Sequence, residues 1–264
     1  MWRLILSCFL CFFLSSQILA TDKKVIRICT EDNFWAPFVF TYDNKVSGMH
    51  ISQIKDVFSS LDYTLELSAA PWKRCILSGQ SGQIDAILSA SYSLERTQYF
   101  YFPSDAPTQE LSEGRLTAAT EVVLVRNGFP SDWDGADETL PAPIGVPLGY
   151  RSAALLRAKG IQIRTPAHYL DMMNMLVRGR VNSVLITKEP AEFYMGHQFK
   201  GAGLKMLNRP YSALSYFLMV SKAGRLSEAE AQEIWRRVAV VRENKARMLE
   251  FRDAAFKKMA SCIT

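Results

Sequence analysis

Few residues in this sequence combine the types and the spacing that chemistry requires. The three histidines, His50, His168 and His197, stand far apart, and no spacing of cysteine and histidine matches a metal site. No nucleophile stands at a recognisable distance from a base, and there is no Ser-His-Asp pattern. We therefore expect surface or packing roles for the histidines, no metal, no cofactor and no enzymatic activity.

The first twenty residues have the features of a secretory signal peptide. Arg3 precedes an apolar run from Leu4 to Leu14, and Ala20 stands before the charged stretch Thr21–Lys24. The apolar run is shorter than the about 20 residues that a bilayer-spanning helix needs. We expect cleavage near Ala20, which removes residues 1–20 and yields a secreted chain without stable membrane insertion.

Cleavage would leave three of the five cysteines, Cys29, Cys75 and Cys262. Disulfides persist in secreted proteins, so one bridge and one free thiol is the simplest arrangement. Cys29 and Cys75 both lie in the first half of the chain and could meet there, but the sequence alone does not assign the pair.

The distribution of charge excludes one class of partner. The chain carries a formal net charge of +5, and its basic residues are scattered, apart from neighbours such as Arg236-Arg237 and Lys257-Lys258. Proteins that bind nucleic acids gather their basic residues on one face. We therefore expect no nucleic-acid partner.

From Val25 onward, short runs of β-forming residues alternate with segments of helical period. That alternation is typical of α/β proteins, in which helices connect parallel strands. The predicted strands are Val25–Cys29, Thr64–Leu67, Ile84–Leu88, Glu121–Val125, Ile144–Val146, Ile161–Ile163, Val181–Ile186 and Tyr216–Val220.

Three helices have clear signals between these strands. The segment from Ile51 to Leu61 places its apolar residues on one face, as in a helix that lies on a sheet. Thr165-Pro166 predicts the start of a second helix, which would end at Gly179. Ser227 and Glu230 have the spacing of a capping box and predict the start of a third helix.

Two segments, 77–87 and 176–184, follow one plan of helix, glycine and strand, which predicts two lobes. Polar stretches at 112–115 and 208–212 are the expected crossings between them. The expected division is residues 21–112 for the first part of lobe 1, 113–211 for lobe 2, and 212–264 for the return to lobe 1 and the C-terminal helices. Two crossing strands would form a hinge in a monomer, and a ligand would bind in the cleft between the lobes.

The order and spacing of several short motifs carry a resemblance to a known family. The motifs are Ile26–Glu31, Trp35–Phe38, Gly48–Ile51, Pro71–Arg74, Gly82–Ile87, Ser89–Arg96, Phe102–Ser104, Ile144–Tyr150 and Gly179–Val181. The chain resembles the type II extracellular solute-binding proteins of family 3, related to those of polar amino acid ABC transporters. The resemblance implies a two-lobed type II periplasmic binding protein fold, a location in the periplasm, and an ABC permease as partner.

The resemblance also assigns ligand-binding residues in lobe 1. Arg96 matches the family arginine that grips the ligand carboxylate, a task that suits the planar guanidinium. The alternative for Arg96 is a surface salt bridge with Glu95 or Asp105. Ser89 and Ser91 match the positions that supply hydrogen bonds to the ligand.

Three further residues of lobe 1 match family positions at the ligand. Trp35 and Trp72 fall where aromatic side chains sandwich the ligand, although Phe34 or Phe38 could replace Trp35 in this role. Burial in the core is the alternative for both tryptophans. Glu31 matches an acid that contacts the ligand or its hydrogen-bond network.

Lobe 2 normally contributes a helix N-terminus, whose free N–H groups favour an anion. Here that start is Gly149-Tyr150-Arg151-Ser152. Tyr150 stands where the family usually has a smaller polar residue, which suggests a reshaped pocket, and Arg151 could add a second positive charge. Both could equally be exposed residues at a helix start.

Several departures from the family bear on the ligand. Where an acid often holds the ligand's amino group, this chain has Thr187-Lys188-Glu189, and only Glu189 could take that role. Asn182 replaces the usual aspartate, and His50 stands where an acid is common. The expected ligand is therefore a small polar or anionic molecule that bears a carboxylate, either an amino acid or an organic acid.

Two other functions compete with import. The closed lobes could dock on a membrane receptor, which would make the protein a sensor. Some relatives of this fold are periplasmic dehydratases on cyclohexadienyl substrates, and Glu31 with Glu189 could form an acid–base pair across the lobes. The absence of any other catalytic pattern makes binding the favoured function.

Overall fold

The computed structural model describes residues 23–130 and 133–261. The predicted signal peptide and Cys262 lie outside this range. The elements are β1 (Lys24–Glu31), β2 (Phe40–Tyr42), β3 (Lys45–Ser47), α1 (Met49–Ser59), β4 (Tyr63–Ala70), α2 (Trp72–Gln80), β5 (Ala86–Ser91), η1 (Arg96–Gln98), β6 (Phe100–Tyr101), β7 (Thr117–Arg126), η2 (Asp137–Thr139), β8 (Ile144–Gly145), α3 (Arg151–Ala158), β9 (Ile163–Arg164), α4 (Tyr169–Val177), β10 (Ser183–Thr187), α5 (Lys188–Gly196), β11 (Leu204–Met206), β12 (Ser212–Ser221), α6 (Glu228–Glu243) and α7 (Lys245–Ser261).

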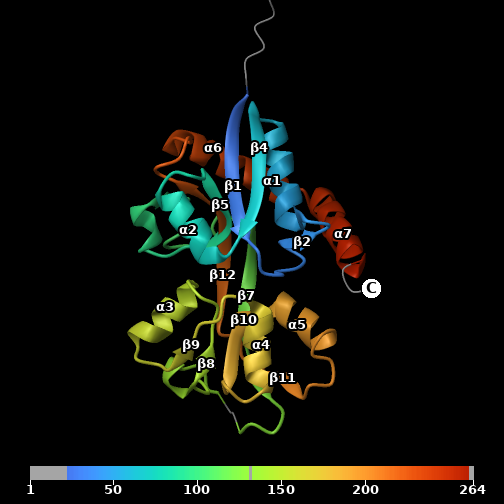
Figure 1. Cartoon of the computed structure of the whole chain (residues 1–264). Helices are drawn as coiled ribbons and strands as arrows, with labels where there is room; N and C mark the ends of the chain where they lie inside the picture. The colour runs from blue at the N-terminus through green and yellow to red at the C-terminus, as the bar shows by residue number, and fades with distance from the viewer. Residues whose placement is uncertain (1–22, 131–132, 262–264) are drawn as a thin grey trace, which may run out of the picture.

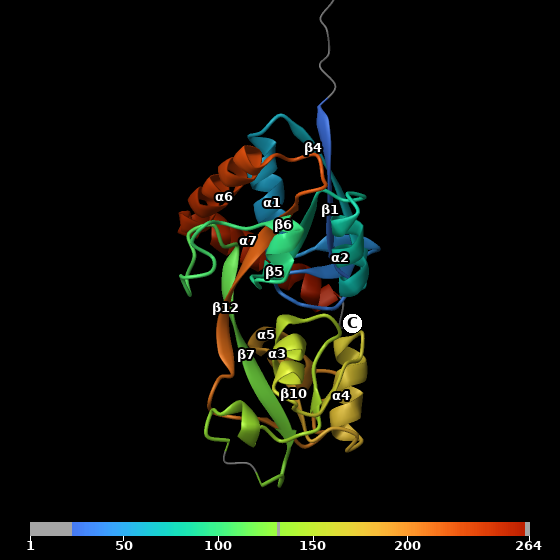
Figure 2. The same cartoon turned by 90° about the vertical axis from the view of Figure 1, so that its left-hand side faces the viewer.

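These elements form two lobes joined by two long strands (Figures 1 and 2). One lobe, called lobe 1, contains β1–β6, α1, α2, α6 and α7, and lobe 2 contains α3–α5 and β8–β11. The strand order is β4-β1-β5-β12-β7-β10-β8-β9, with β4, β1 and β5 parallel to one another. The predicted α/β class and two-lobed fold are confirmed.

The strands β7 and β12 cross between the lobes as an antiparallel pair. Their ladder runs from Ser212 opposite Glu121 to Tyr216 opposite Thr117. Beyond it, β12 pairs with β5 in lobe 1, and β7 pairs with β10 in lobe 2. We retain the lobe boundaries at 112/113 and 211/212 as a proposal.

Helices cover the sheet on both faces in each lobe. In lobe 1, α1 buries Ile51, Ile54, Val57 and Phe58, and this confirms the predicted apolar face. In lobe 2, the opposite faces of β7 belong to two separate apolar clusters, because side chains alternate along a strand. One of these clusters is confined to lobe 2, and the other also contains core residues of lobe 1.

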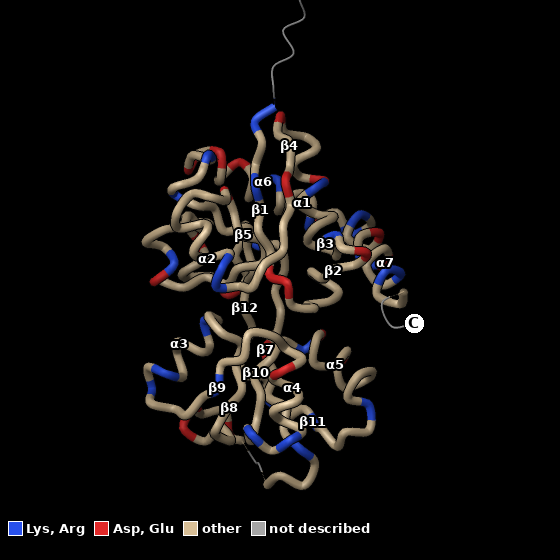
Figure 3. The backbone as a smooth tube through the Cα atoms, in the orientation of Figure 1, with Lys and Arg blue, Asp and Glu red and all other residues tan. Residues whose placement is uncertain are grey.

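Lysine and arginine are spread over both lobes with acidic residues among them (Figure 3). Within the described residues, no helix is long and apolar enough to cross a membrane.

All eight predicted strands overlap observed ones, and four short strands were not predicted, namely β2, β3, β6 and β11. The predicted start of a helix at Thr165-Pro166 is wrong, because this segment is extended. Its backbone continues the pairing with β8, as Val146 donates to the Arg164 carbonyl and Leu148 to the Pro166 carbonyl. The helix α4 begins at Tyr169 instead.

The predicted capping box of α6 is confirmed and also ties together the outer end of lobe 1. The Ser227 hydroxyl accepts from the Glu230 N–H, and the Glu230 carboxylate accepts from the Ser227 N–H at 2.7 Å. The same carboxylate accepts from Lys24 Nζ at 2.7 Å and from the Tyr63 hydroxyl at 2.8 Å. Burial opposes ionisation, but the bonds from Lys24, Ser227 and Tyr63 lower the pKa of Glu230 to about 2.

We predict that Glu230→Ala lowers the free energy of unfolding by about 1–2 kcal/mol at pH 7. An acid with a lowered pKa stabilises the fold above its ordinary pKa, and this contribution is lost as the pH falls from about 4.5 to about 2. Urea unfolding should therefore show a difference in the free energy of unfolding between the two proteins at pH 7. This difference should shrink as the pH falls to about 2. Glu228→Ala, in the same first turn, is the matched control, and an equal loss in that variant would contradict the assignment.

Candidate functional site

A cavity lies between the lobes and the crossing strands. Its walls come from lobe 1, from lobe 2 and from β7 and β12, and the lining residues are Glu31, Trp35, Trp72, Ser89, Ser91, Arg96, Glu121, Tyr150, Arg151, Tyr169, Leu214 and Tyr216. Eight of the ten residues proposed from the sequence are among them. The cavity measures about 30 Å³, which is room for little more than water molecules. The side chains of the two lobes therefore nearly fill the space between them.

Arg96 lies on the lobe 1 wall, at the start of η1. Its Nη1 donates to the Ser91 carbonyl at 2.6 Å, and its guanidinium lies 5.1 Å from the centre of the Trp72 ring. Burial lowers the pKa of Arg96 to about 10, which leaves the group charged at neutral pH. Among the described residues, no carboxylate forms an ion pair with Arg96. The alternative of a salt bridge with Glu95 or Asp105 is therefore not realised.

Ser89 is held in an unusual backbone conformation. Its φ is +68°, and it lies where the pairing of β5 with β12 is interrupted by a bulge. A bulge re-aims side chains next to functional sites. The Ser89 hydroxyl lies 2.8 Å from His50 Nδ1, and burial lowers the pKa of His50 to about 3, so the imidazole is neutral. A neutral His50 therefore supports the pocket wall at Ser89.

Glu31 is the centre of a hydrogen-bond network that crosses the cleft. Its carboxylate accepts a short hydrogen bond from the Tyr150 hydroxyl of lobe 2 and a 2.7 Å bond from Asn33 Nδ2. The Tyr150 and Tyr169 hydroxyls are 3.0 Å apart. Burial raises the pKa of Glu31 to about 7 in spite of these bonds. The acid is therefore poised to change charge near neutral pH.

Asn33 also explains where α4 begins. The Tyr169 N–H donates to Asn33 Oδ1 at 3.0 Å, and Asn33 Nδ2 donates to the Ala167 carbonyl at 3.2 Å. A residue of lobe 1 therefore caps a helix of lobe 2, satisfying an N–H group that has no partner within the helix. No pattern local to residues 165–169 could have predicted this.

Gly149 brings the backbone of lobe 2 against two side chains of lobe 1. Its carbonyl accepts from Trp72 Nε1 at 3.1 Å and from Arg96 Nη2 at 3.2 Å. Its φ is +81°, and a Cβ at this position would lie 3.1 Å from the Trp72 ring. Glycine is required here both for the backbone conformation and for the close approach.

The start of α3 places Tyr150 and Arg151 on the cavity wall, as the resemblance implied. Ser152 follows, and its hydroxyl donates to Glu121 at 3.2 Å. Glu121 also accepts from the Ser212 hydroxyl at 2.7 Å, and burial raises its pKa. The cavity therefore contains two acids, Glu31 and Glu121, and two arginines.

Two residues proposed from the sequence lie outside the cavity wall. The Thr187 hydroxyl accepts a 2.5 Å hydrogen bond from Trp35 Nε1, so it serves the contact between the lobes. Glu189 lies in the first turn of α5, where one carboxylate oxygen is buried without a partner and burial raises the pKa. Their roles at a ligand stay predictions.

Four wall residues were missed from the sequence: Glu121, Tyr169, Leu214 and Tyr216. Glu121 gave one usable signal, since it is an acid at the end of an otherwise apolar predicted strand. Tyr169 was hidden by the misplaced helix start. Within the described residues, no group of His, Cys, Asp and Glu gathers as a metal site.

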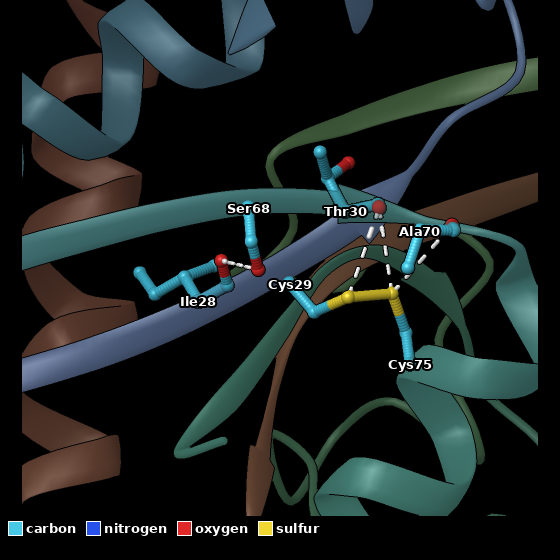
Figure 4. The surroundings of a disulfide bond; sticks show 6 residues. All are labelled: Ile28, Cys29, Thr30, Ser68, Ala70 and Cys75. Carbon is cyan, nitrogen blue, oxygen red and sulfur yellow. Dashed lines mark hydrogen bonds between the residues drawn. A yellow bond between two sulfur atoms is a disulfide. The ribbon is translucent and has the colours of Figure 1, made fainter. Parts of the chain in front are cut away.

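A disulfide between Cys29 and Cys75 fixes the lobe 1 wall (Figure 4). It joins β1 to α2 with Cα atoms 5.7 Å apart. Cys29 lies two residues before Glu31, and Cys75 three residues after Trp72, so the bridge ties together the segments that carry both. The sulfur atoms lie 3.4 and 3.8 Å from the Thr30 carbonyl, which is packing contact because a disulfide has no S–H to donate.

This two-lobed α/β architecture, with a cavity between the lobes, is the fold of the extracellular solute-binding proteins. Residues 26–261 match the family described as bacterial extracellular solute-binding proteins, family 3. The chain belongs to this family, as the resemblance indicated. No curated protein matches the sequence.

Solved structures show the same fold in proteins of several roles. A substrate-binding protein of an amino acid ABC transporter is similar at 20% identity over 88% of this chain and 99% of that one, with a TM-score of 0.67. A histidine kinase sensor domain is similar at 15% identity over 88% and 96%, with a TM-score of 0.72. An ancestral amino acid-binding protein, a precursor of cyclohexadienyl dehydratase, matches at 17% identity over 88% and 95%, with a TM-score of 0.66. At these identities the likeness concerns the fold alone.

We predict that Glu31 makes stability fall as the pH rises from about 4.5 to about 7. The folded state binds this proton more tightly than the unfolded chain, so folding becomes less favourable as the group ionises, by about 3 kcal/mol in total. Urea unfolding at pH 5 and pH 7.5 should show this slope in the unaltered protein and a flatter one in Glu31→Gln. The exposed Glu66→Gln is the control, and parallel slopes in all three proteins would disprove the assignment.

Proposed function

We propose that this protein is a periplasmic solute-binding protein whose lobes close on a small carboxylate-bearing ligand for delivery to an ABC importer. The observation that carries the proposal is Arg96, a charged guanidinium in the cleft without a carboxylate partner. Buried charges in proteins are usually paired, so an unpaired one in a cleft calls for an anion from outside. Family membership supports binding and transport as the role.

Closure follows from the contacts that cross the cleft. A ligand can drive closure only if it binds the closed form more tightly than the open one. A carboxylate on Arg96 would lie beside Gly149 and Arg151 of lobe 2, and would therefore gain contacts only when the lobes meet. Because the cavity has room for little more than water, the lobes would have to separate before a whole solute could bind inside it.

The acids of the cavity are compatible with an amino acid as well as an organic acid. Glu31 and Glu121 could pair with an ammonium group in place of the residue that the family usually has near Thr187. Burial raises the pKa of both acids, and a bound ammonium group would lower both pKa values by favouring the ionised form. The choice between the two ligand classes is left to the binding experiment.

Two other roles remain as alternatives on the same fold. Docking of the closed lobes on a membrane receptor would use the same ligand site, and the similar sensor domain of a histidine kinase gives this role a precedent. A dehydratase would need an acid and a base that face one substrate. Glu189 is not on the cavity wall beside Glu31, so the pair expected from the sequence does not face one substrate, and family membership is what favours binding.

We predict that Arg96→Ala weakens the binding of carboxylate ligands about 100-fold, the loss expected for a charged bidentate contact. A thermal-shift screen of the mature chain against amino acids and organic acids, followed by calorimetry on the best ligand, would measure this. Arg178→Ala, which removes an exposed arginine, is the matched control, and Arg96→Lys should retain part of the affinity. Unchanged affinity in a folded Arg96→Ala protein would contradict the proposal.

A further inference from the structure

An open groove lies directly outside the inner cavity and continues it to the surface. It measures about 730 Å³ and lies between α2 and the 92–95 loop of lobe 1 and α3 of lobe 2. Arg96, Tyr150 and Arg151 line both spaces. A solute bound at these residues could therefore place one end in the inner cavity and the rest in the groove.

The volumes of the two spaces point to the groove as the larger part of the site. Ligand pockets of proteins commonly measure about 300–1,000 Å³. The inner cavity, at about 30 Å³, lies far below this range, and the groove, at about 730 Å³, lies within it. The inner cavity can take a small head group, and the rest of the ligand must extend outward.

The groove is lined by an unusual number of exposed leucines. Of the eleven large hydrophobic side chains that are exposed within the described residues, four lie here. Leu77 and Leu94 of lobe 1 are 55% and 77% exposed, and Leu148 and Leu155 of lobe 2 are 37% and 39% exposed. Single exposed leucines are common, but a group of four around one groove marks a binding surface for an apolar partner.

The charges of the groove indicate the sign of the ligand. Lys73, Arg96, Arg151 and Arg157 line it, against a single acid, Glu95. Within the described residues, none of these four cations forms an ion pair with a carboxylate. An apolar surface bordered by unpaired cations suits a molecule that has both an apolar chain and a negative head.

We infer that the ligand is an amphipathic carboxylate, whose head binds Arg96 and whose apolar chain lies in the groove between Leu77 and Leu94 on one side and Leu148 and Leu155 on the other. This inference rests on the proposed function and names the class of ligand for it. The chain contacts leucines of both lobes, so its burial is complete only when the lobes are closed. Apolar burial would thus add to the preference for the closed form that the contacts of the carboxylate with lobe 2 provide.

The test is calorimetric titration of the mature protein with acetate, hexanoate and decanoate. Each additional CH₂ group buried in the groove should tighten binding about fourfold until the groove is full. Decanol, which lacks the carboxylate, should bind far more weakly than decanoate, and Arg96→Ala should remove this difference. Equal affinity for all three acids would overturn the inference.

Variants of the groove separate this inference from the function itself. Leu77→Gln combined with Leu155→Gln should weaken decanoate binding at least tenfold and leave acetate unchanged. Leu249→Gln, an exposed leucine of α7 outside the groove, is the matched control. One outcome is that short acids or amino acids bind through Arg96 with an affinity that depends neither on chain length nor on the leucine substitutions. In that case the proposed function stands and this inference fails. If no carboxylate binds the unaltered protein, both fail.

Discussion

The antiparallel pairing of β7 with β12 is the constraint on which the site depends. These strands carry the chain between the lobes, and their ladder, from Thr117 opposite Tyr216 to Glu121 opposite Ser212, is also the hinge. Glu121, Leu214 and Tyr216 belong to it and line the cavity. The hinge therefore forms part of the cavity wall, and a solute bound there as proposed would contact the strands that join the lobes.

The cleft contains groups that would destabilise an ordinary core. Arg96 is charged without a carboxylate partner, and Glu31 and Glu121 have raised pKa values because they are buried. Burying such groups costs free energy unless each is paired. The clustering of such groups between the lobes is typical of a functional site, where local stability is given up for binding. The disulfide beside Glu31 and Trp72 holds this wall of the cleft in place.

The sequence predicted those features that are set by local pattern. The Ser227–Glu230 capping box and the apolar face of α1 were correct, and each of the eight predicted strands overlaps an observed one. Eight of the residues that the family motifs pointed to line the cavity. The failures have long-range causes. The start of α4 depends on Asn33, which lies in the other lobe. Thr187, predicted at the ligand, does not line the cavity, and its hydroxyl accepts from Trp35 Nε1 instead. Contacts that form only when two lobes meet leave no periodic signal in the sequence.

Tyr150 connects the departures of this chain from its family with the shape of its site. By the resemblance, Tyr150 stands where the family usually has a smaller polar residue. Its side chain reaches across the cleft, and its hydroxyl donates to the Glu31 carboxylate. It also packs against Trp72 and Tyr169, with ring centres 6.3 and 6.2 Å away. A side chain of this size leaves the inner cavity too small for a whole amino acid while the lobes are closed. Because Tyr150 and Arg151 also face the outer groove, the change that reduces the inner space directs the body of a ligand outward.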